Sequence, residues 1–137
     1  MHILMCNDDG ILADGLRHLA SYLSQYYRIT VVAPANEQSA KSHALTAEVP
    51  LKLDACNGED ENPRLYALTG TPSDCMKFGL SYLLTDDMPD LVISGINHGF
   101  NLGSDVLYSG TVSAAMESGF YGIPGLALSV ERLSLIH

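Results

Sequence analysis

Long apolar runs are missing from this sequence, because glycine, serine or a charged residue soon interrupts each one. A helix that crosses a bilayer needs about 20 apolar residues, so we expect no membrane span. The N-terminus also lacks the layout of a signal peptide, since Asp8 and Asp9 come too early. Cysteine is scarce: Cys6, Cys56 and Cys75 are widely spaced and odd in number, which disfavours a disulfide framework or a zinc site. These absences predict a cytoplasmic protein with free thiols.

Basic residues are few as well. Seven Lys and Arg stand against 16 Asp and Glu, which gives a net charge of −9. An acidic surface repels a polyphosphate backbone, so we expect no extended nucleic acid as partner. Lys and Arg are absent between Met88 and Glu131. A small phosphorylated ligand bound in that segment must therefore be held by backbone N–H groups, hydroxyls and amides.

The chain has the composition of a globular protein, and strand-like and helix-like segments alternate along it. Its 137 residues are 47% hydrophobic and 17% charged, which is typical of one domain over residues 1–137. Apolar runs predict strands at 3–6, 29–35, 65–69, 90–96 and 125–130, with an edge strand within 48–55. Helical spacing or a capping sequence predicts helices at 14–27, 71–84 and 111–121. Such alternation predicts an α/β fold with a mostly parallel sheet covered on both faces, a three-layer sandwich.

Polar residues follow three of the predicted strands. Asp8 and Asp9 come after the first, Ser39 lies in the loop after the second, and Asn97 follows the strand at 90–96. Ligands of parallel sheets bind beyond the carboxyl ends of the strands, and these oxygen donors suit a hard cation such as Mg²⁺, Mn²⁺ or Ca²⁺. A cation would turn the repulsion between the two aspartates into attraction. The alternative is a plain turn, since Asn-Asp-Asp-Gly also suits Asx hydrogen bonds and a glycine at positive φ.

A second group of candidates precedes the predicted helix at 111–121. Ser109, Gly110 and Thr111 stand at its start, where the helix dipole and free N–H groups favour a phosphate. The simpler interpretation is that Ser109 or Thr111 only caps the helix. His43 and His98 lie in the loops of the expected site and have the chemistry of proton donors. An exposed loop histidine without a role is the commoner case.

The chain resembles the survival protein E (SurE) family in five segments, which occur in the family's order: NDDGI, VVAPANEQSAKS, GTPSDC, PDLVISGINHGFNLGSDVLYSGTVSAAMES and GIPGLALS. The resemblance implies a Rossmann-like fold and metal-dependent hydrolysis of nucleoside 5′-monophosphates by stationary-phase survival proteins. It implies one Mg²⁺ or Mn²⁺ per subunit and homo-oligomers, dimers or tetramers, in the full-length family. The implied metal ligands are Asp8, Asp9, Ser39 and Asn97, and the implied substrate contacts are Asn101, Ser109, Gly110 and Thr111. We further expect Asp8 or Asp9 to orient or deprotonate the attacking water.

The sequence departs from the family in two respects. Ala40 stands where the family usually has glycine, which matters if that position needs a positive φ or a close backbone approach. Family chains also continue past the C-terminus of this sequence, so we expect a chain truncated at its C-terminus relative to the family. The truncation predicts weak or absent nucleotidase activity, and self-association through apolar surface that the missing part would cover.

Three other interpretations compete with this one. A Mg²⁺-binding receiver domain of a signalling protein has a similar length and an acidic pair after its first strand. It also needs a phosphoacceptor aspartate after the third strand and a lysine after the last, and this sequence has neither there. A haloacid-dehalogenase-like phosphatase would place its nucleophile at Asn7, which cannot form an acyl phosphate. The third alternative is an inactive fragment that keeps the fold.

Overall fold

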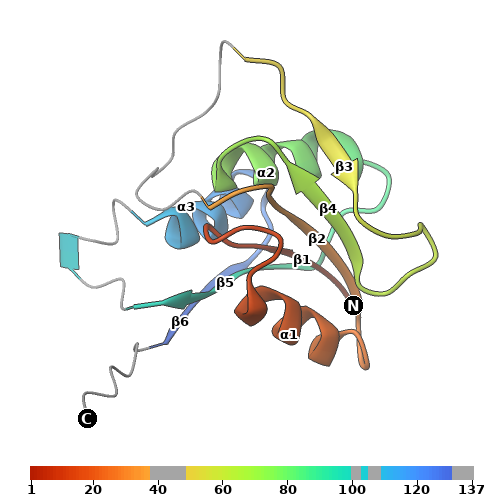
Figure 1. Ribbon diagram of the computed structural model, residues 1–137, viewed down its shortest axis with the longest axis horizontal. Helices are drawn as coiled ribbons and strands as arrows, with labels where there is room; N and C mark the ends of the chain where they lie inside the picture. The colour runs from red at the N-terminus through yellow and green to blue at the C-terminus, as the bar shows by residue number, and fades with distance from the viewer. Residues whose placement is uncertain (38–48, 100–102, 105–108, 131–137) are drawn as a thin grey trace.

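The computed structural model describes residues 1–37, 49–99, 103–104 and 109–130. Within them, six strands form one sheet in the order β3-β4-β2-β1-β5-β6 (Figure 1). The strands are β1 (His2–Cys6), β2 (Arg28–Pro34), β3 (Leu53–Ala55), β4 (Arg64–Leu68), β5 (Leu91–His98) and β6 (Gly125–Val130). All neighbouring strands are parallel except β3, which runs antiparallel to β4 at one edge. The predicted mostly parallel sheet and its edge strand are thus confirmed.

Helices cover both faces of this sheet, as Figure 1 shows. The helices are α1 (Asp14–Leu23), α2 (Pro72–Phe78) with the π-helical turn η1 (Gly79–Leu83), and α3 (Gly110–Glu117) with the 3₁₀ turn η3 (Ser118–Tyr121). Alternate residues of β1 point to opposite faces: Ile3 packs in the cluster that contains Leu16 of α1, and Leu4 packs with Met76 of α2. The result is the expected three-layer, Rossmann-like sandwich.

The start of α2 follows directly from its sequence. Thr71 caps the helix, because its Oγ1 accepts a hydrogen bond from the backbone N–H of Asp74 at 3.2 Å. The Asp74 carboxylate in turn accepts from the backbone N–H of Thr71 at 2.9 Å. Pro72 occupies the first helical position, where no N–H is needed. This reciprocal capping box confirms the prediction made from Thr-Pro-Ser-Asp.

The spacing of apolar residues at 111–121 predicts a buried face of Val112, Ala115, Met116 and Gly119 for α3, and this prediction is only partly right. Ala115 is buried, but Met116 is 55% exposed and Gly119 is also exposed. The helix buries Thr111 and Ala114 beside Ala115, and Ser118 follows them in η3. Two of these residues are polar but satisfied: the Thr111 hydroxyl donates to Asp8 and the Ser118 hydroxyl donates to the carbonyl of Ala115. A pattern that counts only apolar residues cannot find such a face.

The order of the strands reverses at β1. The chain passes from β1 to β2 on one side of it, and β5 pairs with its other side. In open α/β sheets, the crevice beyond the carboxyl ends of the two strands at such a switch point is where ligands bind. The loops that follow β1 and β5 therefore hold the position of greatest functional interest. In the described residues, no helix is long and apolar enough to cross a membrane.

Candidate active site

The loop after β1 is closed by the side chain of Asn7. This fully buried amide donates to the carbonyl oxygen of Gly10 at 3.0 Å and accepts from the N–H of Gly10 at 3.1 Å. Gly10 has φ +103°, a conformation that favours glycine. The next residue, Ile11, donates its N–H to the carbonyl of Pro34 at 2.8 Å, which ties the loop to the end of β2. Asn7 and Gly10 thus provide the hydrogen bonds of the turn, so the turn does not account for the two aspartates between them.

Asp8 lies against the first turn of α3. The Thr111 hydroxyl donates to its Oδ1 at 3.2 Å, and the carboxylate residue is only 7% exposed. A Cβ on Gly110 would lie 2.9 Å from the Cβ of Asp8, so this close approach requires glycine. Burial raises the pKa of the Asp8 carboxyl above its ordinary value, the Thr111 hydrogen bond opposes that shift, and the charge of Glu37 adds to it.

Asp9 is half-buried beside it and experiences the same kind of environment. Burial raises the pKa of the Asp9 carboxyl, and the negative charges of Asp8 and Glu37 raise it further. Among the described groups that shift it, only His98 acts in the opposite direction. The charges of Asp8 and Glu37 thus add to the effect of burial at Asp9, and two adjacent carboxyls with raised pKa values favour a bound cation.

Asn97 lies at the same edge, on the neighbouring strand. β5 extends two residues beyond the predicted end at Ile96, so Asn97 is inside the strand and not just after it. Cys6 at the end of β1 pairs with Ser94 of β5, and the register with β6 is irregular between Ser94 and Asn97. Gly95 makes this irregularity, because it has φ +128° and a Cβ there would overlap the carbonyl oxygen of Leu128. The Asn97 amide nitrogen donates to the carbonyl of Gly99 at 3.2 Å, which leaves the amide oxygen as its group for a cation.

The helix start at 109–111 has the cap that was the simpler of the two interpretations. Ser109 caps α3, since its hydroxyl accepts from the N–H of Val112 at 3.2 Å. Gly110 and Thr111 are buried and pack against or bind Asp8. The N-terminus of α3 thus adjoins the acidic pair, a position that also suits a phosphate group.

Some predicted site residues cannot be placed. Ser39, His43 and Asn101 lie outside the described residues. The turn interpretation of Asn-Asp-Asp-Gly predicted the Asx hydrogen bonds that Asn7 makes. One contributor was missed by the sequence analysis, the charge of Glu37. Nothing local in the sequence indicates that Glu37 approaches the aspartates.

The donor set fits a hard divalent cation. Asp8 and Asp9 offer carboxylate oxygens and Asn97 an amide oxygen, all of the type that Mg²⁺ and Mn²⁺ prefer. In the described parts of the chain, no group of three or more His, Cys, Asp or Glu side chains could hold a metal. The two aspartates therefore need neutral oxygen ligands to complete a coordination shell, from side chains such as Asn97 or from water.

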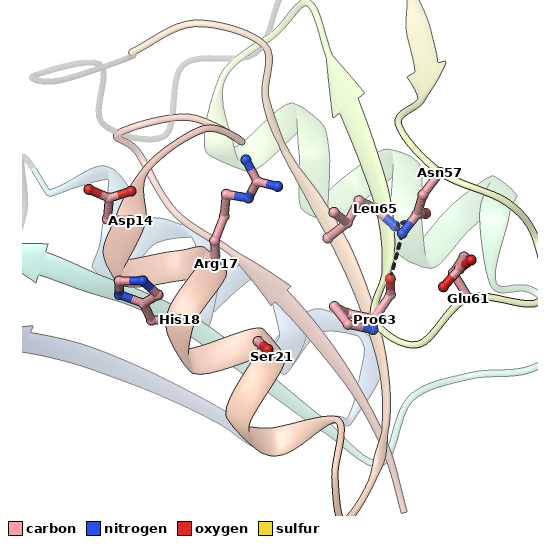
Figure 2. Close-up of a pocket in the computed structure, with 8 residues that line it drawn as sticks. All are labelled: Asp14, Arg17, His18, Ser21, Asn57, Glu61, Pro63 and Leu65. Atoms are coloured by element: carbon pink, nitrogen blue, oxygen red, sulfur yellow. Dashed lines mark hydrogen bonds between the residues drawn. The ribbon is translucent and has the colours of Figure 1, made fainter.

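A separate cavity of about 430 Å³ lies elsewhere, between α1 and the segment that leads into β4 (Figure 2). Its walls include Arg17, His18 and Ser21 on one side and Asn57, Pro63 and Leu65 on the other. The Asn57 amide is engaged within the wall, since it donates to the carbonyl of Pro63 at 2.8 Å and accepts from the N–H of Leu65 at 2.9 Å. None of the acidic residues at the carboxyl edge lines this cavity, so it is distinct from the candidate active site.

Comparison with known proteins agrees with the geometry. Residues 3–134 match the family described as Survival protein SurE. The chain belongs to the SurE family. It is 54% identical over 129 residues to 5′-nucleotidase SurE of Thermoanaerobacter sp. (strain X514), which covers 94% of this chain and 50% of that protein. It is 50% identical over 130 residues to 5′-nucleotidase SurE of Vibrio vulnificus (strain YJ016), with 95% of this chain and 49% of that protein covered.

A solved SurE structure shares the fold. The crystal structure of the SurE protein from Aquifex aeolicus superimposes with a TM-score of 0.84 at 41% identity, over 99% of this chain and 53% of that one. The chain thus spans about half the length of the SurE relatives it matches and corresponds to their N-terminal part. Membership of this family argues against the receiver-domain and haloacid-dehalogenase alternatives.

Proposed function

We propose that this chain carries the catalytic centre of a metal-dependent 5′-nucleotidase, which hydrolyses nucleoside 5′-monophosphates to nucleoside and phosphate. The observation that carries the proposal is the adjacent pair of buried Asp8 and half-buried Asp9 at the switch point of the sheet, where burial and like charges raise the pKa values of both carboxyls. Perturbed carboxyls of this kind concentrate at functional sites. The names of the SurE relatives, all 5′-nucleotidases, support the substrate class.

The proposed ligands of one Mg²⁺ or Mn²⁺ are Asp8, Asp9, Asn97 and Ser39. A bound cation of this type polarises a phosphoryl oxygen and lowers the pKa of a coordinated water. The Thr111 hydroxyl fixes the Asp8 carboxylate by a hydrogen bond. Asp8 is therefore suited to remain a metal ligand in one orientation throughout the reaction. Asp9 is the less buried of the two and has His98 as a neighbouring charge, so it is suited to orient or deprotonate the attacking water.

The phosphate is proposed to sit at the N-terminus of α3. Backbone N–H groups at Gly110 and Thr111 point out of the helix start, where the dipole favours an anion. Ser109 supports this role indirectly, because its side chain holds the first turn in shape, and Asn101 is proposed to add an amide. This arrangement accounts for the absence of Lys and Arg between Met88 and Glu131, since the cation and the helix together balance the charge of the phosphate.

The test is release of inorganic phosphate from AMP and GMP by the purified chain, with Mn²⁺ and with EDTA. We expect slow release that requires the metal and is lost in Asp9→Asn. The exposed Asp14→Asn, a matched change in the first turn of α1, should retain it. Release that persists in EDTA and in Asp9→Asn would contradict the proposed site. Stabilisation by Mn²⁺ without any release would leave the inactive, fold-retaining alternative.

A further inference from the structure

Two asparagines hold the loop that connects β3 to β4. The amide nitrogen of Asn57 donates to the carbonyl oxygen of Pro63 at 2.8 Å, and its amide oxygen accepts from the backbone N–H of Leu65 at 2.9 Å. Figure 2 shows Asn57 turned toward Pro63, so this side chain closes the loop on itself. At the other end of the loop, the Asn62 side chain makes hydrogen bonds to backbone groups in the segment 24–29. The loop is thus anchored once to β4 and once to the chain that enters β2.

The residue that follows each asparagine gives the two anchors different chemistry. Asn57 is followed by Gly58, and this is the only Asn-Gly pair in the sequence. An asparagine loses its amide when the backbone nitrogen of the next residue attacks the side-chain carbonyl carbon, and glycine hinders this attack least because it has no side chain. Asn62 is followed by Pro63, whose ring nitrogen carries no hydrogen and cannot attack in this way. One anchor of the loop is therefore chemically labile and the other is resistant.

We propose that Asn57 is a deamidation site, and that its hydrogen bonds form a latch on the loop which the reaction opens irreversibly. The backbone nitrogen of Gly58 forms a bond to the side-chain carbonyl carbon of Asn57. The carbon–nitrogen bond of the amide breaks, and its nitrogen leaves as ammonia with the proton from Gly58, so a cyclic succinimide remains. Water then opens the ring and leaves aspartate or isoaspartate at position 57. Water is the only co-reactant, and the reaction needs no oxidant or reductant.

The hydrogen bonds of Asn57 determine when the reaction takes place. They direct the amide toward β4 and restrain the rotation that brings its carbon to the nitrogen of Gly58. The reaction therefore requires a local opening of the loop. Arg64 opposes that opening, because its guanidinium donates to the carbonyl oxygen of Glu59 from Nε at 3.1 Å and from Nη2 at 2.7 Å. The folded state thus slows the modification without removing the reactive pair.

The product cannot restore the closed loop. An aspartate at position 57 still accepts from Leu65, but it has no N–H for the carbonyl of Pro63, so two oxygen atoms would face each other. Isoaspartate also lengthens the main chain by a methylene group. The new charge joins the exposed acidic stretch 59–61, where like charges repel. The inference is independent of the proposed function, since this loop supplies none of the proposed metal ligands or phosphate contacts.

The site is tested by incubating the purified chain at mildly alkaline pH, with measurement of released ammonia and mapping of the modified peptides. We expect Asn57 to convert to aspartate and isoaspartate, faster in urea than in the native protein. Gly58→Ala should lose most of the conversion in both conditions, and Asn62 should stay intact in both. Conversion that persists in Gly58→Ala, or that occurs at another asparagine instead of Asn57, would overturn the proposed site.

The latch is tested by Arg64→Gln, which removes two hydrogen bonds within the loop and leaves Asn57 and Gly58 unchanged. Native conversion should be about tenfold faster, because losing such contacts favours the open loop, whereas the rate in urea should equal that of the wild type. Lys77→Gln is the matched control, since it removes the same charge from an exposed position on α2. It should convert like the wild type. Equal native rates in Arg64→Gln and the wild type would overturn the latch.

The state of the loop after the reaction has its own measurement. The extra negative charge allows the deamidated fraction to be separated by ion exchange and digested with a protease that cleaves after glutamate. Cleavage after Glu59 and Glu61 should be about tenfold faster than in the unmodified fraction, the factor that loss of one hydrogen bond produces in an opening equilibrium. Cleavage after Glu117, at the end of α3, serves as the control and should be equal. Equal cleavage of the loop in the two fractions would show that Asn57 does not hold it closed.

Discussion

The two ends of the sheet hold acidic residues in opposite ways. At the amino end, Asp87 accepts from Arg28 Nη2 at 2.7 Å, and Asp90 accepts from the backbone N–H of His2 at 2.7 Å. At the carboxyl end, burial and like charges raise the pKa values of Asp8 and Asp9. The ion pair and the hydrogen bond at the first end stabilise its carboxylates, whereas burial and repulsion at the second end destabilise the charged forms.

The acidic residues at the amino end of the sheet contribute to stability, whereas those at the carboxyl end suit a function. Folding alone favours the arrangement of the amino end, in which Asp87 has a cationic partner and Asp90 a backbone donor. The charged forms of Asp8 and Asp9 are unfavourable unless a cation compensates them, and burial makes their repulsion stronger. The carboxyl end is therefore the end built to bind a cation, and the following experiments test that difference.

The largest expected effect is on the metal response of Asp9→Asn, which keeps the side-chain shape and removes one charge. We expect the wild type to gain about 2.7 kcal/mol when Mn²⁺ exceeds its dissociation constant about a hundredfold, and the variant to gain little. In EDTA the variant should be as stable as the wild type or more so, by about 1–3 kcal/mol, because the repulsion is relieved. Thermal melts of both proteins with EDTA and with Mn²⁺ measure this. A wild type that no divalent cation stabilises would rule out the metal site.

Local signals made much of this site predictable. Asn7 to Gly10 form a compact turn motif after a short apolar strand, and the capping box of α2 is contained in four residues, Thr71 to Asp74. Both are determined by neighbours in the sequence, and both were predicted, the first with its turn and metal interpretations left open. The parallel sheet followed from the alternation of strand and helix patterns in the same way.

Contacts between distant segments were not predictable. The hydrogen bond from Thr111 to Asp8 joins residues 103 positions apart, so no local pattern indicates it. The buried face of α3 was partly mispredicted for the same reason. Thr111 is buried at this contact, but a threonine looks like a surface residue in a pattern that counts only hydrophobic side chains. The predicted strand already passed Gly95, and the extension of β5 to His98 was missed because Asn97 and His98 begin a segment rich in Gly and Asn, a composition typical of a loop.

A smaller effect is expected from Gly110→Ala, which tests how closely α3 must approach Asp8. The added Cβ would lie 2.9 Å from Asp8 Cβ and 3.2 Å from Pro72 Cγ. We expect a loss of about 1–3 kcal/mol in the free energy of unfolding, typical of overpacking, and a weaker Mn²⁺ response. Urea unfolding with and without Mn²⁺ measures both. The control is Gly119→Ala, where nothing lies within 4 Å of the added Cβ. Equal losses in the two variants would mean that the approach to Asp8 is not the cause.

The two ends should also respond to pH in opposite directions in metal-free protein. Asp8 and Asp9 have pKa values raised above 3.8 in the folded state, so folding favours their protonated forms and stability rises as the pH falls through the raised values toward 3.8. Burial lowers the pKa of His2 below 6.5, so the unfolded chain binds the proton more readily and stability falls as the pH drops below 6.5.

Variants at each end separate these two contributions. Denaturation in EDTA across this pH range should show the gain at low pH reduced in Asp8→Asn and the loss below 6.5 reduced in His2→Gln. Wild-type metal-free protein and both variants are compared at the same ionic strength. Identical pH profiles for Asp8→Asn and the wild type would show that Asp8 does not titrate differently in the folded state.

The smallest effect is expected at the amino end, from Asp87→Asn. This change removes the ion pair between Asp87 and Arg28. The Arg28 side chain is 60% exposed and the Asp87 side chain is 49% exposed. Exposed pairs of this kind contribute about 0–1 kcal/mol, and high salt should reduce even that difference by screening. Because Asp87 lies at the end opposite to the acidic pair, the gain in stability that Mn²⁺ gives to Asp87→Asn should equal the gain of the wild type.

Thermal melts at low and high salt, with and without Mn²⁺, measure both the salt-dependent difference in stability and the gain from Mn²⁺. If Asp87→Asn reduced the Mn²⁺ response as strongly as Asp9→Asn, cation binding would not be confined to the carboxyl end, and the contrast between the two ends would fail.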